Sequence, residues 1–332
     1  MIRQIKYIKS KEHNPYLNLA LEEYLLHNVK EEECILYLWQ NEKTVVIGRN
    51  QNPWKECKIN ELKENGGYLV RRLSGGGAVF HDLGNLNFTF LVKKPDYDVD
   101  KQLEVIIRAL HNMGIPGKKS GRNDITVEEK KFSGNAFYRD GKNCYHHGTI
   151  LINVDMNHLS KYLNVSRDKL ESKGVKSVKS RVTNLIEYKP DLTIEKMEEE
   201  LIKAFSLEYQ LTAKESTLNE TIYKELYQRK ERFESWDWIY GNNISFAYHM
   251  GKRFSWGDFE IHINTQKGRV SQCKIYSDAM DIGLVDLISK GISKSAFSSK
   301  DMIEAIRKIP VEDSRRENMI DDICSLIMSE DL

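Results

Sequence analysis

Residues 71–82, RRLSGGGAVFHD, combine basic side chains, three consecutive glycines and a His-Asp pair. Glycine is used where the backbone needs a positive φ or where a ligand comes close to the main chain. Consecutive amides in such a turn can point into one concavity and bind an anion. The stretch therefore predicts a cradle for a phosphate or carboxylate, and a flexible hairpin turn is the alternative that the glycines alone favour.

The two arginines that precede the glycines are expected to have different roles. Strand alternation puts Arg71 and Arg72 on opposite faces, with Ser74 on the side of Arg72 if the strand continues that far. We expect Arg72 to face the anion and Arg71 to be a surface charge.

Three further clusters contain candidate side chains. In SGRND, Asp124 could hold Mg²⁺ or contact an adenine amine, and an Asx-type turn is the alternative. In KKFSG, at most one of the adjacent lysines is functional, and a surface lysine is the commoner case. In HHGT, the adjacent His146 and His147 point opposite ways on a strand, which is not metal-site spacing. Cys144, just upstream, is a candidate thiol nucleophile or a buried, inert cysteine.

The composition bounds the class of protein. The chain has 332 residues, of which 40% are hydrophobic and 30% charged, and its net charge is +1. These values are typical of a globular protein long enough for two domains, and they give no support for nucleic-acid binding. Five scattered cysteines without CxxC spacing fit a reducing compartment. With no signal peptide and no membrane-spanning apolar run, the sequence predicts a soluble, cytoplasmic protein without a membrane partner.

The elements that must position these clusters follow from periodicity and turn signals. Asn14-Pro15 and Asn52-Pro53 each predict the start of a helix, the second running to about residue 64. Asp140-Gly141 predicts a hairpin turn. Gly241-Asn242-Asn243 predicts a linker before a smaller C-terminal module. The expected strands are at 35–39, 44–47, 68–70, 78–80, 86–90, 124–127, 131–138, 145–154, 254–263 and 270–276. The other expected helices are at 101–113, 194–205, 220–233, 280–290 and 299–308.

The order of the clusters is more specific than any one of them. GRNQNPWKE, RRLSGGGAVFHD, SGRND, KFSG and HHGT follow one another, and KSRVTNL (179–185) and FSWG (254–257) come later. The series closely resembles lipoate–protein ligases of the two-domain form, over essentially the whole chain. The resemblance implies the α/β (α+β) fold shared with biotin–protein ligases. Its mixed-sheet catalytic domain would span residues 1–245 and a small α+β accessory domain residues 252–332.

The resemblance also implies a two-step reaction. Lipoate and MgATP give lipoyl-AMP and pyrophosphate, and the lipoyl group then passes to a specific lysine. The implied acceptors are lipoyl domains of 2-oxoacid dehydrogenase E2 subunits and the glycine-cleavage H protein. The enzyme itself is expected to be a monomer. Leu73 departs from a small polar residue of some relatives, which leaves octanoate as an alternative substrate.

The family's functional residues map onto this chain by the same motifs. Lys131 corresponds to the essential lysine, which would bridge the lipoyl carboxylate and the α-phosphate. Asp124 is the candidate for Mg²⁺, and Trp39 and Leu19 are candidates for the lipoyl tail. The residues implied for ATP and lipoyl-AMP are Arg72, Gly75, Gly76, Gly77, Ala78, Val79, Phe80, Asp124 and Lys131. Those implied for lipoate are Arg72, Ser74, His81, Lys131, His147 and Gly148.

Three other functions remain open at this point. An ATP-independent octanoyl or lipoyl amidotransferase of the same fold would use a cysteine thioester, for which Cys144 is the candidate. A biotin ligase would need a GRGR-type loop, which RRLSGGGAVFHD is not. A non-catalytic lipoyl-binding protein would not need Lys131.

Overall fold

The computed structural model describes residues 1–121, 123–164, 182–218, 220–240, 248–266, 268–293, 295–311 and 313–330. Arg122, residues 179–181 of the KSRVTNL motif and the expected linker at 241–243 lie outside the described residues. The chain divides into two compact units. The first comprises Met1–Val46, Glu56–Arg72 and Ala78–Ile239, and the second Ile47–Lys55, Leu73–Gly77 and Tyr240–Leu332.

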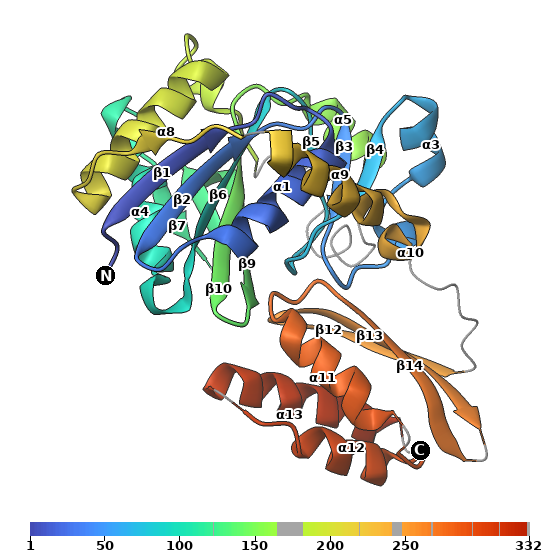
Figure 1. Ribbon diagram of the computed structural model, residues 1–332. Helices are drawn as coiled ribbons and strands as arrows, with labels where there is room; N and C mark the ends of the chain where they lie inside the picture. The colour runs from blue at the N-terminus through green and yellow to red at the C-terminus, as the bar shows by residue number, and fades with distance from the viewer. Residues whose placement is uncertain are drawn as a thin grey trace. The chain divides into compact units, whose positions relative to one another are not determined.

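A large sheet dominates the first unit (Figure 1). Its strands run in the order β11-β1-β2-β6-β10-β9-β8-β7, and β4-β3-β5 form a smaller sheet. The strand bounds are β1 (Gln4–Lys9), β2 (Glu33–Trp39), β3 (Thr44–Ile47), β4 (Tyr68–Arg71), β5 (Val79–His81), β6 (Asn85–Lys93), β7 (Lys118–Ser120), β8 (Asp124–Val127), β9 (Lys130–Asp140), β10 (Asn143–Leu151) and β11 (Lys214–Glu215). Because β1 pairs in parallel with β2 and β11 while the other neighbours are antiparallel, the sheet is mixed. The predicted fold class is confirmed.

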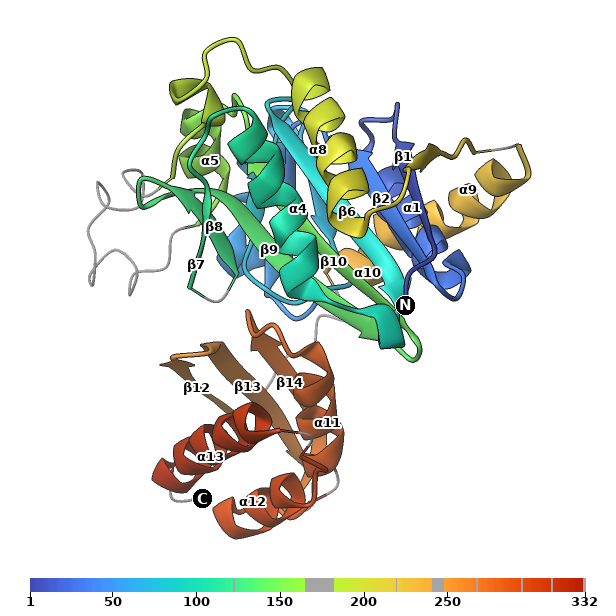
Figure 2. The ribbon, with the colours of Figure 1, turned by 90° about the vertical axis from the view of Figure 1, so that its left-hand side faces the viewer.

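Helices cover both faces of this sheet. Those before the C-terminal module are α1 (Pro15–Asn28), α2 (Pro53–Glu56), α3 (Ile59–Glu64), α4 (Val99–Asn112), α5 (Met156–Tyr162), α8 (Ile194–Tyr209), α9 (Glu220–Glu234) and α10 (Trp236–Ile239), with short 3-10 turns η1 (Lys94–Asp96) and η2 (Leu185–Glu187). Helices α4 and α8 lie together over one face and α1 over the other (Figure 2). The apolar core lies between the sheet and α4 and α8, with Phe88 and Phe90 of β6 against Phe205 of α8. We call this side the α4 face and the opposite side the α1 face.

Hydrogen bonds explain where α1 begins and why the second expected helix is interrupted. Asn14 Oδ1 accepts from the amides of Tyr16 and Leu17, so α1 starts as its Asn-Pro pair predicts. The single helix expected from 52 to 64 is wrong, because α2 and α3 are separate. Between them Lys58 N donates to the Tyr162 carbonyl at 2.9 Å, which takes the backbone out of helical pairing.

The second unit contains a three-stranded antiparallel sheet, β12 (Tyr248–Phe254), β13 (Gly257–Gln266) and β14 (Arg269–Ser277). Helices α11 (Ile282–Ile292), α12 (Ser299–Arg307) and α13 (Ser314–Ser329) share an apolar core with it. The strand predicted at 254–263 corresponds to β13, which begins only at Gly257, because β12 ends at Phe254 and the chain turns at Ser255 and Trp256. The periodicity did not predict α13. Arg316 of α13 makes a two-pronged ion pair with Asp281, the N-cap of α11.

A buried histidine on the α4 face connects β10 with β9 and with the residue that precedes β8. His146 of β10 is fully buried, and its Nε2 lies 2.9 Å from Asn135 Oδ1 on β9. Asn135 in turn exchanges hydrogen bonds with Asn123, since each side-chain amide donates to the other's carbonyl. Burial, followed by the charge of His147, lowers the pKa of His146 to about 3. The ring is therefore neutral at physiological pH, and Nε2 donates to Asn135.

The buried, neutral His146 makes the fold sensitive to acid. The unfolded chain binds a proton at this position below about pH 6.5, whereas the folded protein does so only near pH 3. Stability therefore falls as the pH drops through this window, by up to about 1.4 kcal/mol per pH unit for this group. We expect the free energy of unfolding, measured with urea between pH 7 and 4, to fall less steeply for His146→Gln than for the wild type. This holds whatever the variant's stability at pH 7. The exposed His13→Gln is the control and should keep the wild-type slope; equal slopes in all three proteins would contradict the assignment.

Candidate active site

Lys131 and Asp124 form an ion pair on the α1 face. The distance from Nζ to Oδ1 is 2.7 Å, and the two side chains are 37% and 38% exposed. The KFSG and SGRND clusters meet here because β8 and β9 are antiparallel neighbours. The ammonium is thus fixed by one carboxylate yet remains open to solvent, so an incoming anion can reach it.

A one-residue shift in the register of β8 and β9 sets the direction of Lys131. Ile125 lies opposite Ser133. The next residue, Thr126, lies opposite Lys131, which leaves Phe132 as an extra residue of β9. Directly opposed residues share a face, so the shift puts Lys131 on the α1 face and leaves Phe132 fully buried in the core. Regular alternation would turn the lysine toward the α4 face.

Gly134 provides the space that the lysine side chain occupies. A Cβ at this position would lie 2.9 Å from Lys131 Nζ and 3.0 Å from its Cε. The amide of Gly134 donates to Thr149 Oγ1 of β10 at 3.2 Å. At the start of β9, the Lys131 carbonyl accepts from the Thr183 amide at 2.9 Å. The backbone around the ammonium is therefore held from two sides, and the glycine leaves its path over β9 clear.

Arg72 and His81 are buried polar groups of the smaller sheet and its margin. Burial lowers the pKa of Arg72 to about 10, which still leaves it charged at neutral pH, and its Nη1 donates to the Val46 carbonyl at 3.3 Å. Burial, followed by the charges of Arg72 and His147, lowers the pKa of His81 to about 3. Asn41 Nδ2 lies 3.2 Å from His81 Nδ1 and donates to it. The neutral ring therefore carries its hydrogen on Nε2, which has no acceptor among the described residues.

A buried hydrogen-bond network lies under α1. Glu22 of α1 is 1% exposed, and its Oε1 lies 2.7 Å from both Thr89 Oγ1 and His147 Nδ1. Trp39 Nε1 donates to Thr89 Oγ1 at 3.1 Å. A carboxylate only accepts, so both neighbours donate to it. His147 thus faces the α1 side with Lys131, whereas His146 packs on the α4 face.

Other predicted residues have clear packing reasons for their type. A Cβ on Gly148 would lie 2.6 Å from Phe88 Cζ and 2.7 Å from Asn135 Oδ1, so the glycine is required on the α4 face. Phe80 is buried against Tyr162 of α5, with ring centroids 5.5 Å apart. Ala78 and Val79 are half-buried. Leu19 is buried in α1.

Ser74 and the three glycines belong to the second unit. Ser74 is fully buried, and its carbonyl accepts from the Arg49 amide at 2.8 Å. A Cβ on Gly75 would lie 2.2 Å from the Ala279 carbonyl oxygen, so no side chain fits there. Gly76 has a φ of 90°, which favours glycine. A Cβ on Gly77 would meet nothing within 4 Å.

The expectation that Arg71 is a surface charge is wrong. The residue is 7% exposed, and its guanidinium donates to the carbonyls of Trp238 and Ile239 at the end of α10. Trp238 Nε1 donates back to the Arg71 carbonyl at 2.8 Å. Arg71 therefore ties α10 to β4.

Cys144 lies on the wrong face of β10 for a nucleophile of this site. It is fully buried in the core on the α4 face, two residues from His146. Burial raises the pKa of its thiol. A thiolate there would be neither formed readily nor exposed to the groups around Lys131.

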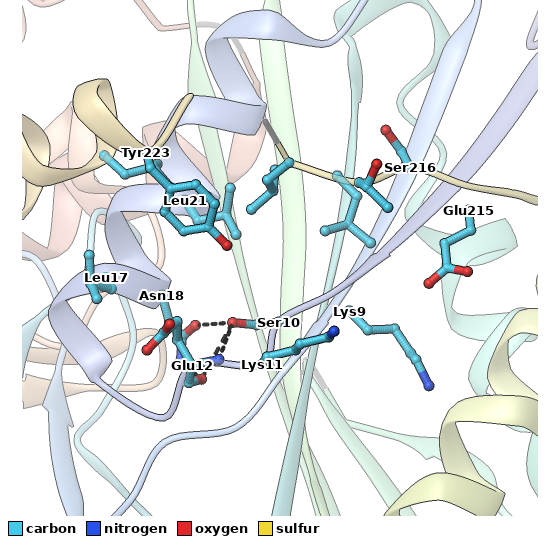
Figure 3. A pocket seen from close by; sticks show the side chains of 14 residues that line it. Lys9, Ser10, Lys11, Glu12, Leu17, Asn18, Leu21, Glu215, Ser216 and Tyr223 are labelled. Carbon is cyan, nitrogen blue, oxygen red and sulfur yellow. Dashed lines mark hydrogen bonds between the residues drawn. The ribbon is translucent and has the colours of Figure 1, made fainter. Parts of the chain in front are cut away.

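A cavity of about 210 Å³ lies elsewhere in the first unit, near the ends of β1 and α1. Figure 3 shows Lys9, Lys11 and Tyr223 around it. Ser10 Oγ donates to Asn18 Oδ1 at 2.7 Å, and Asn18 Nδ2 donates to the Gln40 carbonyl. The cavity contains none of the predicted site residues, and its buried Asn18 is used by the fold.

Three residues of the α1 face escaped the sequence analysis: Glu22, Asn87 and Thr89. All are 2% exposed or less. Alternation along β6 separates its apolar side chains from Asn87 and Thr89, but it gives no sign that the polar side is also buried. No local pattern indicates that Glu22 is buried, because a charged residue beside the apolar positions of α1 is expected at the surface.

Comparison with known proteins decides the family. The model of the lipoyl protein ligase A/B catalytic domain matches residues 14–206, and that of the bacterial lipoate protein ligase C-terminus matches residues 243–327. A lipoate-protein ligase A from Psychrobacter cryohalolentis is 38% identical over 98% of this chain and 99% of its own length. The chain belongs to the lipoate–protein ligase family. Another lipoate-protein ligase A, from Bdellovibrio bacteriovorus, is 37% identical over 93% of each chain.

Solved structures agree with this assignment. P. falciparum LipL1 in complex with lipoate has 34% identity and a TM-score of 0.87, over 98% of this ligase and 99% of that chain. A lipoate-protein ligase A bound with ATP has 25% identity and a TM-score of 0.64, over 73% of this chain and 99% of that one. The bipartite lipoate protein ligase of Thermoplasma acidophilum, analysed with its E2 lipoyl domain, has 26% identity and a TM-score of 0.65. The match covers 75% of this chain and 100% of that one. The chain is therefore a ligase enzyme, as predicted.

We expect Gly134→Ala to impair this ligase without unfolding it. The new methyl group would meet the flexible end of Lys131 rather than the backbone, so the ammonium moves and the strands stay. A misplacement of this kind costs on the order of 10–100-fold in lipoate ligase activity. Gly291→Ala in α11 is the control, since its Cβ finds its nearest neighbour at 3.6 Å. Activity in Gly134→Ala equal to that of the control would show that the position of the ammonium is not critical.

Proposed function

We propose that this ligase activates lipoate with ATP to lipoyl-AMP, releasing pyrophosphate, and then transfers the lipoyl group to a protein lysine. The family, and relatives whose structures contain lipoate in one case and ATP in another, support both substrates. The observation that carries the proposal is the Lys131 ammonium, which is held in place by Asp124 and open to solvent.

In the first step a lipoate oxygen attacks the α-phosphorus of ATP, and the bond to pyrophosphate breaks. Both reactants are anions, so positive charge placed beforehand at the reacting oxygens lowers the barrier. Lys131 supplies this charge and takes no part in proton transfer. Arg72 adds a second fixed positive charge beside the phosphates. Its burial means that little reorganisation is needed when the anion arrives.

The remaining assignments complete the two substrate sites. Gly75, Gly76 and Gly77 would let the main chain approach the α-phosphate, and Ala78, Val79 and Phe80 would line the nucleotide. Ser74, His81, His147 and Gly148 would contact lipoate together with Arg72 and Lys131. Trp39 and Leu19 would line its tail.

The residues present fit a magnesium ion held mainly by ATP. Mg²⁺ is commonly bound by one or two carboxylates plus substrate phosphates. Asp124 provides one accessible carboxylate, and the described residues contain no cluster of three or more His, Cys, Asp or Glu that would bind a metal alone. Asp124 would therefore hold the ion, which neutralises phosphate charge, once Lys131 has turned to the substrates.

In the second step the acceptor lysine attacks the acyl carbon and AMP leaves. The acceptors that we propose are lipoyl domains of E2 subunits and the glycine-cleavage H protein. The study of the Thermoplasma ligase with its E2 lipoyl domain supports the first. None of the helices in the described parts of the chain is long and apolar enough to cross a bilayer. We propose a cytoplasmic monomer.

Exchange of labelled pyrophosphate into ATP measures the first step alone. We expect exchange that depends on lipoate in the wild type and a loss of about 100-fold or more in Lys131→Met, because a fixed charge at the reacting oxygens is removed. Lys130→Met is the matched control, because it removes an adjacent lysine and leaves the Lys131 ammonium on the α1 face. Cys144→Ala should exchange normally.

Two results would contradict the proposal. One is the lack of exchange by a wild-type protein that binds lipoate, and the other is normal exchange by Lys131→Met. Transfer of a lipoyl group without ATP that Cys144→Ala abolishes would instead support the thioester route.

A further inference from the structure

We infer that Asn87 is a specificity residue, which with His81 offers neutral N–H donors to the sulfur atoms of the lipoate ring. The inference rests on the proposed function, since it takes lipoate as the substrate of this site. It would explain why the α1 face carries buried polar side chains where an acyl chain is to lie.

Four residues form one row across the α1 face and lead to Asn87. Gly134 on β9 donates its amide to Thr149 on β10. Thr149 lies opposite Asn87 on β6, and Asn87 opposite Trp39 on β2. Neighbouring strands are about 4.8 Å apart, so Asn87 lies about 10 Å and Trp39 about 14 Å from β9. Lys131 Nζ lies over Gly134 and thus at the start of the row.

The row has the right length for lipoate. With its carboxylate at Lys131, an extended lipoyl chain that crosses the strands brings its ring to Asn87 and Trp39. The charged end of the substrate then meets an ammonium, and its uncharged end meets uncharged groups.

Two buried N–H groups at the far end of the row lack acceptors within the described protein. Asn87 is 2% exposed; its Oδ1 accepts from Asn85 Nδ2 at 3.0 Å, and its own Nδ2 has no acceptor. His81 is 3% exposed, and its Nε2–H also lacks one. Both border Trp39: Asn87 is its cross-strand partner, and the His81 ring centroid lies 6.3 Å from that of Trp39.

The orientation of both donors is set by neighbours. The amide of Asn18 donates to Asn41 Oδ1, so the amide nitrogen of Asn41 points to His81 Nδ1 and donates to it. The neutral His81 ring therefore carries its hydrogen on Nε2. A buried donor without an acceptor is costly, so a ligand that supplies even a weak acceptor gains more there than in water. Divalent sulfur is such an acceptor, and a methylene group is not.

Calorimetric binding of two matched acids tests the inference. Lipoate and cyclopentylpentanoate have the same chain and ring size, but the second has methylene groups in place of both sulfurs. The wild type should prefer lipoate. In Asn87→Leu the ratio of the two affinities should fall by about three- to tenfold through weaker lipoate binding, with the other acid unchanged or tighter. Asn87→Val, which suits a strand, is the second variant if the first does not fold.

The control is Asn143→Leu on β10, whose side chain accepts from Lys93 Nζ; it should keep the wild-type ratio. A ratio unchanged by Asn87→Leu, or an equal loss for both acids, would overturn the inference. Pyrophosphate exchange with the same proteins separates it from the proposed function. A wild type that binds lipoate selectively through Asn87 but exchanges nothing would refute adenylation and leave this inference standing. A wild type that binds neither acid would refute the inference on Asn87.

Discussion

The ammonium of Lys131 is fixed on one face of a sheet while it stays open to solvent, and the packing of the first unit places it there. Lys131 lies on the α1 face only because β9 has one extra residue, Phe132, whose ring is buried in the core on the other side. The core therefore stabilises the irregularity: moving Phe132 out would expose a fully buried aromatic ring. Packing on the α4 face thus determines where the charge lies on the α1 face.

Hydrogen bonds on the α4 face also help to fix the Lys131–Asp124 ion pair. His146, Asn135 and Asn123 connect β10, β9 and the residue that precedes β8 from the α4 side. Asp124 follows Asn123 directly, so the network fixes both ends of the Lys131–Asp124 contact. This explains why SGRND, KFSGN and HHGT occur together in one chain: each contributes one residue to the network and one to the site.

The two faces of the sheet also explain what the sequence could predict and what it could not. The start of α1 and the candidates Asp124 and Arg72 follow from local patterns, whereas the mixed fold and the choice of Lys131 follow from the family resemblance of the motif series. The register shift could not be read, because it depends on how Phe132 packs against distant helices. Arg71 was misassigned because its partners, the carbonyls of Trp238 and Ile239, come long after it in sequence. The burial of Glu22 and Thr89 is likewise visible only once α1 lies over β6 and β10.

Alternation along β10 bears on the chemistry itself. Cys144 and His146 point to the α4 face, whereas His147 and Thr149 point to the α1 face with Lys131. A thioester mechanism would need the thiol on the α1 face, and that would require β10 to slip by one residue. Such a slip would bring His147 into the apolar core and break its contact with Glu22, while His146 would lose Asn135. The arrangement that keeps both histidines satisfied is the one that buries the thiol and leaves a lysine at the site. This arrangement is consistent with the proposed activation by charge, and it leaves the thiol no place in it.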